Sequence, residues 1–376
     1  MARCAAPLAV NAAELRRYSR HLLIPEVGLQ GQERLRAARV LVVGAGGLGS
    51  PSLQYLAAAG VGTIGVIDDD AVDETNLQRQ TLFSPANVGQ SKALVAAARL
   101  RDLNPSIAVE PLPFALDGDN AREIVRQYDV VLDCTDRFAT RYLISDACFF
   151  EKKVDVYASI FRFDGQLSVL CAQSGPCYRC LFPEPPPAEL TPTCAEGGVL
   201  GALAGVVGSW QSAEALKILL GVGEPLAGRI LLIDTLRARV REVRFERDPA
   251  CALCGDAPQI FDVERAPAEV AEDRTIVEID AEELSETLDD ATLLDVREPH
   301  EAVLGTIDGS VSIPASQLEA RMSELDTARR YVVACRVGVK SLWAVRRLRE
   351  AGFGRLAHLR GGLLAYAARR EDFEFF

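Results

Sequence analysis

The architecture of this chain is governed by residues 40–70, which read VLVVGAGGLGSPSLQYLAAAGVGTIGVIDDD. Residues 40–43 form a short apolar run of mostly branched side chains bounded by glycine, which is typical of a buried parallel strand. A helix is expected over about residues 50–59, and a second strand over residues 63–67. This order of strand, helix and strand predicts a βαβ unit.

The turn after the first predicted strand is rich in glycine, at positions Gly44, Gly46, Gly47 and Gly49. Glycines let the backbone turn tightly and approach phosphate groups, and the following helix would direct its unpaired N–H groups at the same anion. Further along, Asp68 and Asp70 can accept hydrogen bonds from a ribose. These features predict a nucleotide site, but they fit a dinucleotide dehydrogenase at least as well.

The next polar residues favour ATP as the nucleotide. They are Asn76, Arg79, Gln80 and Lys92. Two cations and two amides suit a triphosphate, whereas a nicotinamide cofactor has no need of them. We therefore predict ATP, and the dehydrogenase alternative requires that the protein bind NAD more tightly than ATP.

Composition limits the possible partners and the compartment. The length of 376 residues favours two domains, and a formal net charge of -12 argues against broad nucleic-acid binding. The longest apolar stretch, residues 197–210, is too short and too rich in glycine to span a bilayer. Ten cysteines without a convincing secretory signal indicate metal binding, catalysis or core packing. We expect a cytoplasmic protein that contacts neither nucleic acid nor membrane.

The rest of the chain alternates predicted strands and helices in two blocks. The first block continues with helices at residues 90–103, 121–128 and near 205–220, and strands at 107–112, 130–134, 166–171 and 229–233. The second has strands at residues 275–279, 293–296, 310–313 and 331–334. The alternation predicts parallel sheets with helices on their faces, in an α/β fold. Asp136 follows the strand at 130–134, at the sheet edge where such folds bind ligands.

These blocks imply a domain division. Residues 1–255 form the nucleotide-binding domain, residues 256–273 are an acidic, proline-punctuated linker, and residues 274–376 form a smaller α/β domain. Residues 11–39 are expected to be helical and amphipathic, with Arg20 on a solvated basic face.

Two pairs of cysteines have the spacing of zinc ligands. They are Cys177 with Cys180 and Cys251 with Cys254, each pair separated by two residues. Four thiolates would close the coordination shell, so the predicted site is structural. Four unrelated packing cysteines, or a redox pair, are the alternatives.

Two further cysteines are candidates for chemistry. Cys194, in TCAEGG, precedes a glycine-rich apolar helix whose start could lower its pKa, although an inert buried cysteine fits equally well. Cys335 opens the loop CRVGVKS between a strand and a helix expected at residues 342–348. Backbone N–H groups of this loop, helped by Arg336 and Lys340, would favour a thiolate or a persulfide. Gly338 and Lys340 belong to the same loop. A cysteine phosphatase needs an arginine where this chain has Ser341, so that function is excluded.

Ordered motifs over residues 13–255 resemble the MoeB/ThiF family of ubiquitin-activating-like adenylyltransferases. The motifs are RYSRHLL, GAGGLGSP, NLQRQTLF, GQSK, CTDRFATR, CYRC, TCAEGGV and CALC. The resemblance implies a Rossmann-like ATP-binding sheet in which Asp68 and Asp70 bind the ribose side and Asp136 positions magnesium. It also implies that Asn76, Arg79 and Lys92 hold the triphosphate. Arg20 would reach the ATP of the other subunit in a homodimer, which replaces the solvated-face interpretation.

Residues 274–376 resemble a rhodanese-like sulfurtransferase domain. The motifs are LLDVREPHE, GSVSIP, CRVGVKS and LRGGLLAY. The chain has Thr306 where rhodaneses usually carry histidine, and Lys340 where they often carry arginine. Both positions bear on the choice of sulfur donor.

The combined resemblance implies a reaction on a small ubiquitin-like sulfur-carrier protein ending in Gly-Gly. ATP would activate the carrier's carboxylate as an acyl-adenylate, and a Cys335 persulfide, loaded by a donor such as a cysteine desulfurase, would attack it. Cys194 would then release a thiocarboxylate. A thioester-forming conjugating enzyme and a non-catalytic docking scaffold are the alternatives, and the pathway that receives the sulfur stays open.

Overall fold

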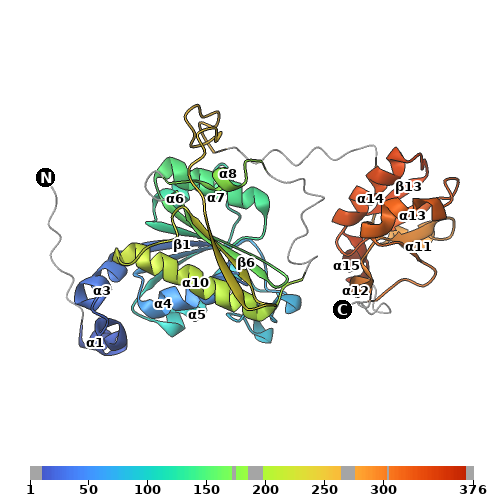
Figure 1. Ribbon diagram of the computed structural model, residues 1–376. Helices are drawn as coiled ribbons and strands as arrows, with labels where there is room; N and C mark the ends of the chain where they lie inside the picture. The colour runs from blue at the N-terminus through green and yellow to red at the C-terminus, as the bar shows by residue number, and fades with distance from the viewer. Residues whose placement is uncertain (1–10, 172–174, 185–197, 264–275, 303–304, 370–376) are drawn as a thin grey trace. The chain divides into compact units, whose positions relative to one another are not determined.

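The computed structural model describes residues 11–171, 175–184, 198–263, 276–302 and 305–369, so Cys194 lies outside the described residues. The chain divides into two compact units, the first reaching to residue 263 of the described chain and the second beginning at residue 276 (Figure 1). Within the described ranges, no helix combines the length and apolar character needed to cross a bilayer. Each unit is an α/β fold with its own sheet, as predicted.

The first unit is built on one sheet of eight strands, in the order β3-β2-β1-β4-β5-β6-β7-β8. Their bounds are β1 Arg39–Val43, β2 Thr63–Ile67, β3 Ala108–Leu112, β4 Val130–Asp133, β5 Val154–Phe161, β6 Asp164–Leu170, β7 Arg229–Asp234 and β8 Arg239–Arg244. The central strands are buried because their apolar residues face helices on both sides. The predicted Rossmann-like sheet is therefore confirmed.

The prediction of a parallel sheet is correct only for β1 to β5. The pairs from β5 to β8 are antiparallel. Only Arg162 and Phe163 separate β5 from β6, and such a short connection can join antiparallel strands but not parallel ones. Arg162 takes the positive φ of 52° that this tight turn needs.

Helices cover both faces of this sheet (Figure 1). They are α1 Ala12–Arg17, α2 Ser19–Leu22, α3 Gly28–Ala37, α4 Gly49–Ala59, α5 Lys92–Leu103, α6 Ala121–Arg126, α7 Phe138–Glu151, α8 Tyr178–Leu181 and α10 Gly201–Leu220, with 3-10 turns η1 Glu74–Asn76 and η2 Pro85–Asn87. One core joins α4, α5 and α10 to the sheet, and a second core joins α6, α7 and α8 to its other face. Residues 11–39, predicted as one helical stretch, form three short helices. The first break is at Tyr18, and Pro25 accounts for the second, between α2 and α3.

The first part of the predicted linker at residues 256–273 belongs to the fold of the first unit. This part is residues 256–263. Val263 is buried, and Arg122 of α6 forms an ion pair of 2.8 Å with Asp262. These contacts tie the segment to the face covered by α6 and α7. Residues up to 263 of the predicted linker therefore belong to the first unit, and its remaining residues lie outside the described ranges.

The second unit holds a five-stranded parallel sheet in the order β11-β10-β12-β13-β9. Its strands are β9 Val277–Ile279, β10 Thr292–Asp295, β11 Val311–Ser312, β12 Tyr331–Ala334 and β13 Leu356–Leu359. Its helices are α11 Glu283–Thr287, α12 Pro299–Ala302, α13 Leu318–Arg321, α14 Val339–Glu350 and α15 Gly362–Ala367, with 3-10 turns η4 Ala315–Gln317 and η5 Met322–Glu324. Separate apolar cores on the two faces of the sheet make it the smaller α/β fold predicted.

An ion-pair network joins α6 to α7 in the first unit. Glu151 accepts hydrogen bonds of 2.7 Å from both Arg126 and Arg122. Those from Arg126, and then from Arg122, lower the pKa of Glu151 from 4.5 to about 2. A carboxyl group with a depressed folded-state pKa stabilises the fold above its unfolded pKa, and this contribution is lost as the pH falls through the folded pKa.

We predict that Glu151→Gln lowers the free energy of unfolding at pH 7 by about 1 kcal/mol. The difference from the wild type should shrink as the pH falls from 4.5 towards 2. Urea unfolding across this range measures it. Glu123→Gln, which removes an exposed carboxylate from α6, the helix that carries Arg122 and Arg126, is the control and should change stability little at any pH. Parallel stability curves for Glu151→Gln and the wild type would contradict this account.

Candidate active sites

A cavity of about 440 Å³ opens at the carboxyl ends of the central strands of the first unit. Its walls come from the segments that follow β1, β2, β3 and β4. Since β2 and β3 lie on one side of β1 and β4 lies on the other, the chain leaves these strands in opposite directions. The cavity therefore lies at the topological switch point, where open α/β sheets bind their ligands.

Most residues predicted for the nucleotide site line this cavity. They are Gly44, Gly46, Gly47, Asp68, Asp70, Asn76, Arg79, Gln80, Lys92 and Asp136. Gly49 does not; it begins α4, and a Cβ atom there would clash with the backbone carbonyl of Gly44. Gly49 thus lets the glycine turn pack closely on its own helix.

Asp68 connects the glycine turn to the segment after β2 through hydrogen bonds. One of its carboxylate oxygens accepts the Ala45 N–H at 2.7 Å, and the other accepts the Asp70 N–H at 2.9 Å. Burial raises the pKa of Asp68, against the opposing effect of Lys92. The side chain predicted to face a ribose therefore also shapes the loop around the cavity.

Lys92 is held by Asp70 inside the cavity. Its Nζ lies 2.8 Å from Asp70 Oδ2, and its side chain is 7% exposed. Arg79, which also lines the cavity, donates to the carbonyl of Thr75 at 3.1 Å. An anionic ligand would find these two cations already positioned, with Lys92 shared between Asp70 and the ligand.

Two arginines of the cavity wall were not predicted. Arg137 lies 3.9 Å from Asp70, while Arg141 is buried on α7 and donates to the carbonyl of Thr135 at 3.1 Å. The guanidinium of Arg141 lies 4.9 Å from the ring centre of Phe138. Both arginines follow Asp136 closely in the segment CTDRFATR. Because cations on a helix are usually solvated, their place in the sequence did not indicate that they line the cavity.

Below the cavity, buried carboxylates support the segment that carries Asp136. Asp133 accepts hydrogen bonds of 2.9 Å from both the backbone N–H and the hydroxyl of Thr135. Burial raises the pKa of Asp133 and raises that of neighbouring Asp155 well above its ordinary value. Thr135 is therefore held in place directly before Asp136.

Arg20 and Cys194 stand apart from this cavity. Arg20 is exposed on α2 and is not among the residues that line the cavity of its own chain. Cys194 lies outside the described residues. Their predicted roles remain predictions.

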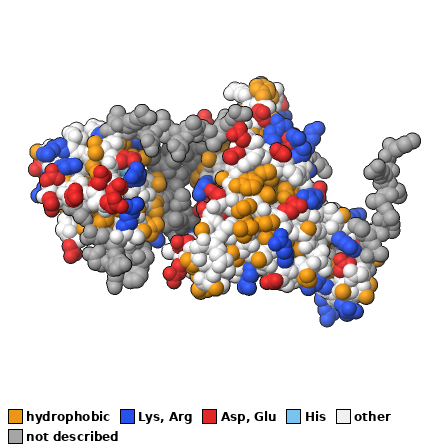
Figure 2. Space-filling model, turned by 180° about the vertical axis from the view of Figure 1, so that it is seen from behind, with side chains coloured by type: hydrophobic (Ala, Val, Ile, Leu, Met, Phe, Trp, Pro, Cys, Tyr) orange, Lys and Arg blue, Asp and Glu red, His pale blue; other side chains and the backbone are white. Residues whose placement is uncertain are grey.

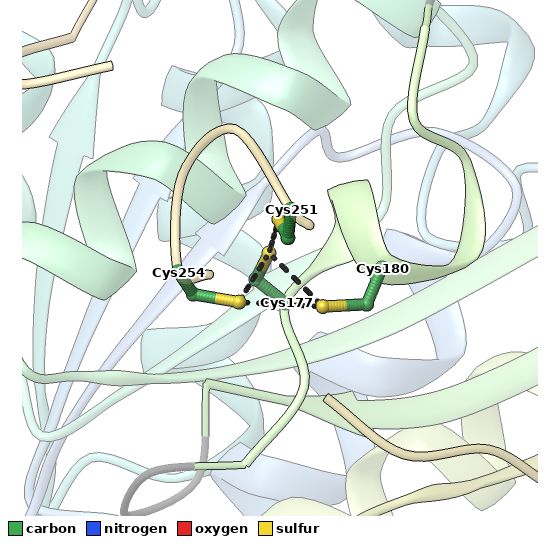
Figure 3. A group of neighbouring side chains, drawn as sticks. All are labelled: Cys177, Cys180, Cys251 and Cys254. Carbon is green, nitrogen blue, oxygen red and sulfur yellow. Dashed lines mark hydrogen bonds between the residues drawn. The ribbon is translucent and has the colours of Figure 1, made fainter. Parts of the chain in front are cut away.

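The four cysteines of the predicted metal site come together in the first unit (Figure 3). Cys177 lies 3.8 Å from Cys180, 3.6 Å from Cys251 and 3.5 Å from Cys254, measured between sulfur atoms. Four sulfurs around a tetrahedral zinc with bonds of about 2.3 Å would lie about 3.8 Å apart. The cluster therefore has the dimensions of a tetrathiolate metal site.

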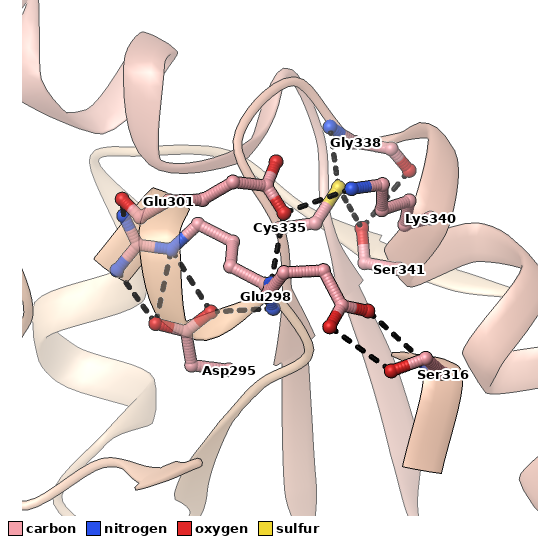
Figure 4. A network of polar contacts seen from close by, with 9 residues as sticks. Asp295, Glu298, Glu301, Ser316, Cys335, Gly338, Lys340 and Ser341 are labelled. Atoms are coloured by element: carbon pink, nitrogen blue, oxygen red, sulfur yellow. Dashed lines mark hydrogen bonds and ion pairs between the residues drawn. The ribbon is translucent and has the colours of Figure 1, made fainter. Parts of the chain in front are cut away.

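In the second unit, Cys335 lies at the carboxyl end of β12, in front of α14 (Figure 4). Its sulfur accepts the Gly338 N–H at 3.1 Å and lies 3.5 Å from the Ser341 hydroxyl. Gly338 has a φ of +100°, a conformation that favours glycine. A Cβ on Gly362 would clash with the carbonyl of Cys335, so α15 can approach the loop only with glycine there.

The cations predicted to support Cys335 are not equivalent. Arg336 is half-buried at the start of the loop. Lys340, at the start of α14, instead forms an ion pair of 2.8 Å with the buried carboxylate of Glu301. Glu301 was not predicted as a site residue, although it ends the motif LLDVREPHE, because the motif alone does not show which of its side chains reaches Lys340.

Comparison with known proteins agrees with this geometry. The chain matches the ThiF family over residues 18–253 and the rhodanese-like domain over residues 280–369. It is 43% identical to a probable adenylyltransferase/sulfurtransferase MoeZ of Mycobacterium tuberculosis, over 96% of this chain and 95% of that protein. It is 54% identical to a sulfur carrier protein adenylyltransferase of Thermus thermophilus, over 65% of this chain and 92% of that protein.

Among solved structures, E. coli MccB with succinimide matches with a TM-score of 0.57 and 23% identity, over 65% of this chain and 75% of that one. At this identity the match concerns the fold alone. Both resemblances inferred from the motifs are confirmed, and the chain belongs to the ThiF family, with a rhodanese-like domain following its ThiF domain.

Proposed function

We propose that this protein adenylates the C-terminal carboxylate of a small ubiquitin-like sulfur-carrier protein ending in Gly-Gly, then converts it to a thiocarboxylate with sulfur from Cys335. The main support is the cavity, where Arg79, Lys92 and Asp136 surround a space at the switch point of the sheet. The names of the relatives, which pair adenylyltransferase with sulfurtransferase, favour this function over thioester-forming conjugation or a non-catalytic scaffold.

In the first step, the carrier carboxylate attacks the α-phosphate of ATP, forming a mixed anhydride with AMP and releasing pyrophosphate. Asp68 and Asp70 would bind the ribose, while Asn76, Arg79 and Lys92 would hold the triphosphate. Gln80, buried with an amide oxygen that lacks a partner among the described residues, lines the same cavity. A carboxylate such as Asp136 suits Mg²⁺, which when bound would neutralise charge on the phosphates.

In the second step, the terminal sulfur of a Cys335 persulfide attacks the activated carbonyl. A carbon–sulfur bond forms, the carbon–oxygen bond to AMP breaks, and AMP leaves with the electron pair. The Cys194 thiolate then attacks the Cys335 sulfur, which releases the thiocarboxylate and leaves a Cys194–Cys335 disulfide for an external thiol to reduce. A cytoplasmic cysteine desulfurase would supply the persulfide.

We further propose that the protein acts as a homodimer in which Arg20 reaches the ATP of the other subunit. Apolar side chains bordered by charged ones gather on one face of the first unit, consistent with contacts to other proteins (Figure 2). The four-cysteine cluster would hold one structural Zn²⁺, since its sulfur spacing suits a closed tetrathiolate shell.

Cys335→Ala should retain carrier-dependent ATP–pyrophosphate exchange, because the groups that activate the carboxylate belong to the first unit. It should form no thiocarboxylate when a persulfide is supplied, which mass spectrometry of the carrier measures. Cys194→Ala should stop one step later, with the carrier attached to Cys335 and releasable by reductant. Loss of exchange in Cys335→Ala would contradict this division of labour.

Protein prepared without chelator should contain about one zinc per chain, because a closed tetrathiolate shell takes one metal. Cys177→Ser should lose the metal and melt at a lower temperature, since binding energy of a structural metal is also folding energy. Cys171→Ser, which changes a buried cysteine outside the cluster, should keep its zinc. Metal-free wild-type protein would rule out the site.

Arg20→Ala and Asp136→Ala should each abolish exchange, and mixed dimers of the two variants should regain part of it, because one composite site would then have both residues. Sedimentation measures the dimer, and exchange measures the recovery. Mixtures without recovered activity, despite confirmed subunit mixing, would argue against a shared site.

A further inference from the structure

The loop that holds Cys335 faces a buried acid from a neighbouring segment. Glu301, on α12 after β10, lies with its carboxylate 2.8 Å from the Lys340 ammonium (Figure 4). Strands β10 and β12 are parallel neighbours, so the segments that follow them meet at the same edge of the sheet. The side chain of Glu301 is only 5% exposed and that of Lys340 is 23% exposed.

The position of Glu301 is fixed independently of Lys340. Its Oε2 also accepts the Glu298 N–H at 2.8 Å, and its backbone carbonyl accepts from Arg297 at 3.3 Å. Arg297 is itself fully buried and forms an ion pair of 2.6 Å with Asp295. The other oxygen of Glu301, Oε1, is buried without a partner among the described residues. Lys340 therefore pairs with the carboxylate of Glu301, whose position is fixed by other contacts.

This pair changes the charge that an incoming sulfur donor meets. The loop from Cys335 to Ser341 carries two cations, Arg336 and Lys340. Glu301 compensates Lys340, and Ser341 contributes a neutral hydroxyl. Backbone donation from Gly338 and the charge of Arg336, which forms no ion pair with the part of the chain that the structure describes, suit a singly charged sulfur anion. A dianion would find the second cation of the loop, Lys340, already paired with Glu301.

We propose that Glu301 is a specificity-determining residue that, by neutralising Lys340, makes the Cys335 loop accept singly charged persulfides in preference to dianionic donors such as thiosulfate. This inference rests on the proposed sulfurtransferase function. The Cys335 thiolate attacks the outer sulfur of the donor and a new S–S bond forms. The donor's own S–S bond breaks with its electron pair, releasing a thiolate from a persulfide or sulfite from thiosulfate. No external oxidant or reductant is needed for this transfer.

The test compares kcat/KM for loading Cys335 from thiosulfate with that from 2-mercaptoethanol persulfide, in the full-length protein. Glu301→Gln keeps an oxygen that can accept the Glu298 N–H but removes the charge. It should raise the ratio of thiosulfate to persulfide use about tenfold, the change that corresponds to about 1.4 kcal/mol in relative barrier height. Lys340→Met, which leaves Glu301 uncompensated, should lower the ratio.

The double variant Glu301→Gln with Lys340→Met removes both charges and should return the ratio towards that of the wild type. Glu298→Gln is the matched control, because it removes a carboxylate from the same segment that is bonded to Ser316 instead of Lys340. It should leave the ratio unchanged.

An unchanged ratio in Glu301→Gln, or an equal rise in Glu298→Gln, would overturn the inference while leaving the proposed function intact. If Glu301→Gln fails to fold, an unchanged ratio in Lys340→Met alone overturns it. Absence of Cys335-dependent transfer from either donor in the wild type would overturn the proposed function together with the inference.

Discussion

The hydrogen bond from the Ala45 N–H to the Asp68 carboxylate connects the two halves of the first βαβ unit at its open end. It joins the glycine turn after β1 to the segment after β2, and Asp68 also accepts the Asp70 N–H. Asp70 in turn holds Lys92 at the start of α5. One carboxylate therefore organises the backbone and the charge around the cavity, and the rest of the site depends on it.

In the second unit, too, the turn at the end of a strand is fixed by contacts with a segment distant in sequence. The carbonyls of Cys335 and Arg336 accept the N–H groups of Leu363 and Leu364 at the start of α15. Helix α15 thereby holds the backbone of the turn in place, while the Gly338 N–H of the turn itself donates to the Cys335 sulfur. In both units a strand ends in a turn that depends on glycine, and backbone groups of that turn are fixed by a partner distant in sequence.

Local signals were sufficient for much of this fold. The glycine turn, the acids after β2 and the Cys335 loop each depend on residues close together in sequence, so spacing alone predicted that they lie at strand ends. The pairing of β6 with β7 and the pairing of Lys340 with Glu301 join residues 39 or more positions apart, and no local pattern encodes such contacts. Arg141 was missed for the same reason, because its burial follows from packing against Phe138 and Tyr157.

Buried polar groups beneath the two sites help to preorganise the loops that carry the functional residues. Asp133 beneath the first cavity and the Asp295–Arg297 pair beneath the Cys335 loop are almost inaccessible, and each hydrogen-bonds backbone next to a residue that faces the ligand. A buried charge is costly unless its partners stay in place, so these groups penalise any rearrangement of the loops above them. The loops then meet a ligand with their donors already aimed, which reduces the reorganisation that binding or reaction requires.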